Sequence, residues 1–153
     1  MVEPAPPSEL HAHLGYWLRM VSNAVSRSFA RKVESEGVTV AEWVFLRVLY
    51  DFERLAPSEL ADRMGMTRGA ISKLADRLVS KGLVVRRANP RDKRAHTLTL
   101  VPSGRALVVR LAQLADRNDE SFFGNLAIEE REQLGQLLRR IAAAHGLATM
   151  PID

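Results

Sequence analysis

The sequence has no cysteine among its 153 residues. This absence excludes a disulfide scaffold, an iron–sulfur cluster, a thiolate zinc site and a thiol redox switch. The sequence also lacks any apolar run near the roughly 18 residues that a membrane-spanning helix requires. The first seven residues have neither the basic region nor the apolar region of a signal peptide. We therefore expect a cytoplasmic protein without a membrane span.

The remaining composition is that of an ordinary globular domain. Hydrophobic residues make up 46% of the chain and charged residues 26%, which excludes a disordered tail or a collagen-like chain. A chain of this length corresponds to one domain and buries roughly 70% of its unfolded surface. We therefore expect a substantial hydrophobic core.

Positive charge is concentrated in one stretch of the chain. Residues 57–105 contain 11 Lys or Arg and 4 Asp or Glu, whereas the other residues contain 11 and 14. A basic segment in a slightly acidic scaffold is typical of a nucleic-acid surface. From charge alone, a solvated basic face that binds nothing is an equally good interpretation.

Hydrophobic spacing predicts helices on both sides of the basic stretch. After a loose tail over 1–7, apolar residues recur every three or four positions from Ser8, and Gly37 is the expected end of that helix. Thr39 and Glu42 have the spacing of a capping box at the start of a second helix. The same periodicity predicts two more helices, over 103–123 and 128–145.

Two short helices are expected inside the basic stretch. The first begins at Pro57, because proline is favoured at the first helical position, and it breaks at Gly65. Thr67 is the expected N-cap of the second helix and Gly82 its stop. Two short helices joined by a tight, glycine-containing turn form the pattern of a helix-turn-helix.

A β-hairpin is expected next. Residues 83–87 are rich in β-branched side chains, residues 97–101 alternate polar and apolar, and the segment 89–94 between them has turn chemistry with four charges. The sequence therefore predicts a mostly α fold with a small β-hairpin wing, an α+β winged helix-turn-helix.

The dimensions of DNA explain why this pattern indicates DNA binding. The major groove admits one helix, and the narrower minor groove admits a loop and favours a guanidinium group. A helix-turn-helix used only for protein contacts and a charged turn that only aids solubility are the alternatives. The predicted DNA-binding residues are Ser58, Thr67, Arg68, Gly69, Ser72, Lys73, Arg77, Arg91, Asp92, Lys93 and Arg94.

This region resembles the core of the multiple-antibiotic-resistance regulator (MarR) family. The wing matches that family's signature of an Asp, one further residue and an Arg, and the helix layout extends the resemblance over nearly the whole chain. Ala56 departs from the family, because a Ser or Thr cap is common at its position. The matching segments are residues 55–74, 78, 81–84, 87, 92–94, 98–100 and 104.

The resemblance implies an obligate, triangular homodimer whose first and last helices interlock between protomers. Residues 8–36 and 103–147 would then be dimerisation helices, and residues 38–102 the winged DNA-binding part of one intertwined domain. The two winged parts of the dimer would reach adjacent major grooves of a pseudo-palindromic operator. The implied function is sequence-specific regulation of transcription, most often repression.

The resemblance also implies release from DNA by a small aromatic or phenolic ligand, bound between the dimerisation helices and the winged part. The candidate ligand-binding residues are Tyr16, Arg19, Met20 and Trp43. Arg19 would pair with a carboxylate and Trp43 would stack on a ring. The plainer interpretations are that Trp43 belongs to the core and that Arg19 is a surface residue.

Neither catalysis nor a bound metal or cofactor is expected. His11 and His13 are two positions apart, so on a helix they point to different sides, and Glu129 and Glu130 are adjacent and cannot act as a paired acid and base. The sequence has no glycine-rich phosphate loop. The rival function is a winged helix that mediates protein contacts or binds DNA non-specifically without ligand control. Sequence-selective binding with a steep salt dependence would separate the two.

Overall fold

The computed structural model describes residues 1–89 and 91–152, without the side chains of Lys93 and Arg94. Within this part of the chain, a short 3₁₀ helix is followed by four α-helices, a two-stranded antiparallel hairpin and two further α-helices. The elements are the 3₁₀ helix η1 (Leu10–Ala12), α1 (Leu14–Glu34), α2 (Val40–Tyr50), α3 (Pro57–Met64), α4 (Arg68–Ser80), β1 (Val84–Asn89), β2 (Asp92–Leu100), α5 (Pro102–Phe123) and α6 (Ile128–Ala144).

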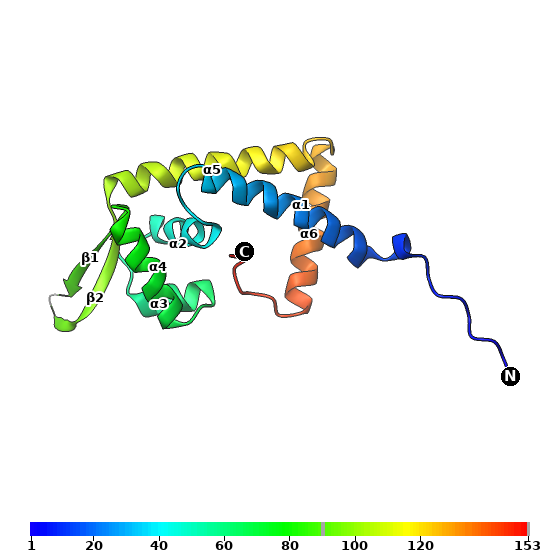
Figure 1. Ribbon diagram of the computed structural model, residues 1–153, viewed down its shortest axis with the longest axis horizontal. Helices are drawn as coiled ribbons and strands as arrows, with labels where there is room; N and C mark the ends of the chain where they lie inside the picture. The colour runs from blue at the N-terminus through cyan, green and yellow to red at the C-terminus, as the bar shows by residue number, and fades with distance from the viewer. Residues whose placement is uncertain (90, 153) are drawn as a thin grey trace.

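The elements form a winged helix-turn-helix at one end of a long helix (Figure 1). Helix α5 leads away from the hairpin with α1 alongside it, and α6 turns back from the far end of α5. Helices α2, α3 and α4 gather beside the hairpin. The predicted fold class, mostly α with a small β-hairpin wing, is confirmed.

The core is centred on α2, which packs against α1, α3, α4, α5 and β2. Its Phe45, Leu46 and Leu49 are fully buried. The predicted capping box at its start is confirmed: the Glu42 amide donates to Thr39 Oγ1 at 3.1 Å, and the Thr39 amide donates to Glu42 Oε1 at 3.3 Å. The sequence therefore fixes the start of the central helix through local contacts alone.

The first long helix starts later than the expected position, Ser8. Residues 10–12 form a 3₁₀ turn, His13 is extended, and α1 begins at Leu14. None of the residues in the 3₁₀ turn is buried. Apolar periodicity alone does not hold a helix together when no neighbour packs against it, because most helical stability comes from tertiary contacts.

The two short helices have the expected bounds. Gly65 ends α3 with a φ of 66°, and Gly82 follows α4 with a φ of 71°, a region that favours glycine. The predicted cap on α4 is confirmed, since the Ala70 amide donates to Thr67 Oγ1 at 3.1 Å. At the start of α3, Ala56 has no capping side chain, but its amide donates to the Glu59 carboxylate at 3.1 Å.

The hairpin is longer than expected. The predicted turn over 89–94 is wrong in extent, because β1 continues to Asn89 and β2 already begins at Asp92, with Asn89 paired to Asp92. The charged residues near the tip are part of the strands, but the pairing is irregular there, since the register shifts between Ala88 and Asn89. At its base, Leu55 and Leu98 exchange backbone hydrogen bonds of 3.0 and 2.8 Å, which anchors the wing to the chain before α3.

The chain after α6 turns back towards the winged part (Figure 1). Residues 147–152, which we call the C-terminal strap, bring Met150 and Ile152 onto the core and place Thr149 beside Gly65. No pattern in the sequence predicts this segment. Among the described residues, no helix combines the length and the apolar character needed to cross a membrane.

Candidate nucleic-acid interface

Helix α4 has one buried face and one exposed face. Ile71, Leu74, Ala75 and Leu78 are buried against the core. The predicted DNA-binding residues of this region occupy the opposite, exposed side, as an amphipathic helix requires. They are Thr67, Arg68, Gly69, Ser72, Lys73 and Arg77.

The first turn of α4 has a defined shape and an open surface. The Thr67 hydroxyl is occupied by the cap, so its role in the protein is to fix the start of the helix. No atom lies within 4 Å of the position that a Cβ on Gly69 would take. Packing inside the chain therefore does not explain this glycine, and the surface there is free for a close approach by another molecule.

A surface ion pair joins α4 to the wing. Arg86 of β1 donates to the carboxylate of Asp76. Asp76 is therefore engaged by the strand, whereas its neighbour Arg77 stays exposed. The pair links the helix and the hairpin that would have to contact DNA together.

The remaining predicted contacts lie on α3 and the wing. Ser58 is half-buried in the first turn of α3. Arg91 and Asp92 are exposed at the tip, where the Arg91 amide donates to Asn89 Oδ1 at 3.0 Å. The backbone of Lys93 and Arg94 belongs to β2, but their side chains lie outside the described part of the chain. A contact between Asp92 and the Arg94 side chain therefore lies outside what the structure describes.

A cavity of about 360 Å³ lies between the long helices α1 and α5 and helix α2. Of the four candidate ligand residues, Trp43 lines this cavity and packs edge-to-face on Phe29, with ring centroids 6.3 Å apart. Tyr16 instead packs with His11 and Trp17 near the start of α1. The described lining residues are Val25, Ser26, Phe29, Val40, Trp43, Val44, Ala115, Asn118, Asp119, Met150 and Pro151.

Asn118 is the buried polar residue in the wall of this cavity. Its amide nitrogen donates to the Val25 carbonyl at 3.2 Å, and its Oδ1 accepts from Lys32 Nζ at 2.9 Å. Lys32 also donates to Ser28 Oγ at 2.7 Å. Asn118 is not among the predicted site residues, although its place in the apolar series with Leu111 and Leu114 of α5 is the signal that marks a buried polar side chain.

Comparisons with known proteins identify the family to which this chain belongs. A model described as MarR family matches residues 36–95, from just before α2 into the wing. A putative transcriptional regulatory protein for the hcr operon of Thauera aromatica is 36% identical over 129 residues, which cover 84% of this chain and 78% of the relative. The chain belongs to the MarR family. It is a MarR-family transcriptional regulator, and its relatives are regulators rather than enzymes.

Solved structures of MarR-family proteins share the fold. A mutant MarR from E. coli in complex with operator DNA has a TM-score of 0.72 and 29% identity, covering 84% of this chain and 92% of that one. BpsR of Bordetella bronchiseptica, solved to explain regulation of its DNA binding by 6-hydroxynicotinic acid, has a TM-score of 0.74 and 26% identity, covering 90% and 98%. Binding to operator DNA is thus a property of a MarR protein with this fold.

Proposed function

We propose that this MarR-family chain binds a pseudo-palindromic, double-stranded DNA operator as a homodimer and represses transcription until a small aromatic or phenolic ligand releases it. The DNA-binding part of this proposal rests on the exposed polar face of α4, which the Asp76–Arg86 ion pair connects to the wing. The MarR complex with operator DNA supports it. A regulator must reach the genome, so we propose a cytoplasmic location.

In this proposal α4 enters the major groove with its N-terminal half. Ser72 and Lys73 address base edges, while Arg68 and Arg77 contribute to phosphate contacts, because a helix in the groove presents its outer face to the bases. Thr67 and Gly69 shape the first turn, and Ser58 adds a polar contact from α3. The wing adds Arg91, Lys93 and Arg94 at the minor groove, with Asp92 orienting the last arginine.

The homodimer is supported by apolar surface that a single chain leaves uncovered. No residue of α6 is buried, although the helix is amphipathic. We propose that residues 8–36 and 103–147 bury these side chains against a second copy, and that 38–102 form the DNA-binding part, because exposed apolar patches of this extent mark interfaces. The exposed large apolar side chains on α1 and α6 are Leu14, Trp17, Leu18, Met20, Val21, Ile128, Leu137, Leu138 and Ile141.

The ligand part of the proposal rests on the cavity around Trp43. Its described lining is mostly apolar, and Asp119 is the ionisable side chain among those residues. Arg19 and Met20 do not line it. A phenolic ligand suits this lining better than a carboxylate, because a carboxylate beside Asp119 would meet like charge. Regulation of BpsR by 6-hydroxynicotinic acid supports a small aromatic ligand, but that compound is a carboxylic acid and does not itself support the preference for a phenol.

Footprinting on the DNA upstream of the protein's own gene would test the proposal, because such regulators often control themselves or their neighbours. Fluorescence anisotropy should then show selective binding with a steep salt dependence, and a phenol series should reverse it more effectively than a matched benzoate series. Equal affinity for unrelated DNA would favour the alternative, a non-specific DNA-binding module. No DNA binding at all would favour a protein-interaction module.

A further inference from the structure

The wing has a second basic surface, of which the predicted DNA-binding residues include only Arg91. An open hollow of about 940 Å³ lies against the hairpin. Three of its six described lining residues are arginines, Arg54, Arg87 and Arg91, and we call this surface the arginine trough. The other lining residues are Ala88, Asn89 and Thr97.

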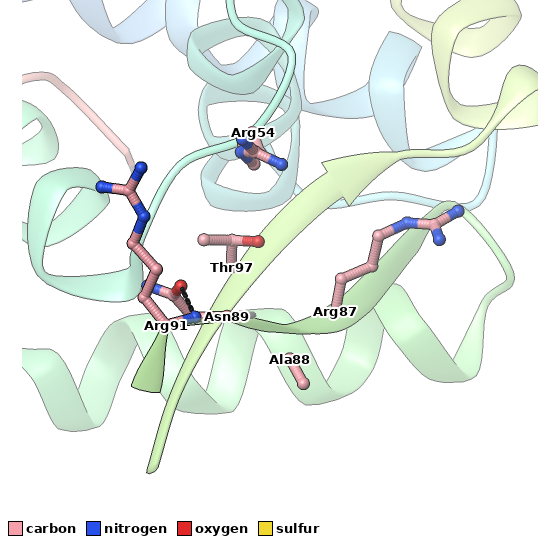
Figure 2. Close-up of a pocket in the computed structure, with 6 residues that line it drawn as sticks. All are labelled: Arg54, Arg87, Ala88, Asn89, Arg91 and Thr97. Carbon is pink, nitrogen blue, oxygen red and sulfur yellow. Dashed lines mark hydrogen bonds between the residues drawn. The ribbon is translucent and has the colours of Figure 1, made fainter. Parts of the chain in front are cut away.

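Three separate segments supply these arginines. Arg54 precedes Leu55, whose bridge to Leu98 holds it at the base of the wing. Arg87 lies on β1 directly opposite Thr97 on β2, and Arg91 lies at the tip. Figure 2 shows the three guanidinium groups on the side of the hairpin to which Thr97 points, whereas Ala88 points to the other side. The trough therefore runs from the base of the wing to its tip.

The positive charges of the trough are not neutralised by acidic residues in its described lining. No acidic side chain is among its described lining residues. Arg86 and Arg47, by contrast, pair with the carboxylates of Asp76 and Asp51. All three trough arginines are exposed. Several cations on one open surface attract an anion by their combined potential.

We propose that the arginine trough binds the phosphodiester backbone of DNA beside the wing. Guanidinium groups recognise phosphate oxygens bidentately, and the Thr97 hydroxyl is a neutral donor on the same surface. The trough is open and continuous with Arg91 at the tip, which suits a long polyanion. A small phosphorylated molecule would instead require a concave site that encloses it. This inference rests on the proposed function and adds Arg54 and Arg87 to the DNA-contacting residues.

The test is the salt dependence of DNA binding by the full-length protein. Arg54→Ala and Arg87→Ala should each reduce the slope of log affinity against log salt by about one, and the double variant by about two. Both should weaken operator and unrelated DNA by the same factor, because phosphates carry no sequence information. Arg117→Ala, which removes an exposed arginine from α5, should leave the slope unchanged.

A conservative variant serves as the control for effects on folding. Arg54→Lys with Arg87→Lys keeps both charges and should retain most of the salt slope, and all variants should melt at the wild-type temperature. An unchanged slope in the double alanine variant, with selective operator binding by the wild type, overturns the trough alone. Absence of selective binding by the wild-type protein overturns the proposed function instead.

A second arm distinguishes DNA from a free phosphorylated molecule. Pyrophosphate is titrated into the protein without DNA, and heat of binding is recorded. We expect no saturable binding in the micromolar range. Saturable binding that is lost in the double alanine variant would assign the trough to a small phosphorylated ligand and overturn the DNA proposal.

Discussion

Lys81 joins the end of α4 to the start of α2. Its Nζ lies 2.7 Å from Glu42 Oε2 and donates to the Gly37 carbonyl at 2.8 Å. The Glu42 side chain is 1% exposed, so Lys81 and the Thr39 amide replace the water that would otherwise stabilise its carboxylate. The contact therefore holds the end of α4, the helix proposed to enter the major groove, to α2 at the centre of the core.

Lys81→Met should destabilise the protein by about 1–3 kcal/mol, because it leaves a buried carboxylate with too few partners. Denaturant unfolding measures the change. Adding Glu42→Gln should recover part of the loss, since no charge is then left buried without its counter-ion. A double variant less stable than Lys81→Met would show that the two residues do not act as a pair.

Lys73 and Arg77 should differ in their effect on DNA binding, although both are exposed on α4. Lys73→Ala should cost about 1–3 kcal/mol on the operator and relax the preference at one position of each half-site. Arg77→Ala should weaken all DNA sequences alike, because it contacts the backbone. Anisotropy on a panel of single-base operator variants measures both. Uniform weakening by Lys73→Ala would contradict its role in base readout.

For individual residues, the sequence predicted contacts between close neighbours along the chain and did not predict contacts between residues far apart along it. The Thr39–Glu42 box and the Thr67 cap follow from a spacing of three residues, which is the same in any helix start. The contact of Lys81 with Glu42 joins positions 39 residues apart. Such a pair depends on how helices pack, and residue spacing along one chain does not specify it.

The wing is the element whose charge and geometry give opposite expectations. If the tip acts only as a positive patch, Asp92→Ala should strengthen binding, because it removes a negative charge near phosphate. If Asp92 orients Arg94 for the minor groove, the same change should weaken binding although the protein becomes more basic. We expect the second result.

A double-mutant cycle on one operator fragment at fixed salt measures this directly. Arg94→Ala should cost more than Lys93→Ala, and the cycle of Asp92 with Arg94 should give a coupling of about 0.5–3 kcal/mol. Arg94→Lys should not restore binding, because an ammonium group is compact and strongly hydrated while guanidinium is planar. Tighter binding by Asp92→Ala would show that the wing acts through charge alone.

Element bounds were predictable where glycine or proline marks them. Pro57, Gly65 and Gly82 fall within two residues of the ends of α3 and α4. The hairpin ends were not predictable, because charged residues such as Asp92 suit a turn and an exposed strand equally well. Nor was the late start of α1, which depends on where a neighbouring element supplies packing.

The whole molecule should be a dimer in solution. Sedimentation at micromolar concentration should give about twice 17.1 kDa, because α6 has no buried residue in the single chain. Leu138→Glu with Ile141→Glu should shift the protein towards monomer and weaken operator binding, whereas Arg117→Ala should not. A folded wild-type protein that sediments as a monomer would contradict both the dimer and the pseudo-palindrome.

The C-terminal strap has a practical consequence for every binding measurement proposed above. Thr149 lies beside Gly65, at the turn between α3 and α4, while the N-terminal tail extends away from the winged part of the same chain (Figure 1). A purification tag or fluorophore fused behind the strap would therefore emerge next to the helix-turn-helix and compete for space with DNA. Attachment in front of Met1 leaves that side clear, so surface immobilisation and labelling belong at the N-terminal end.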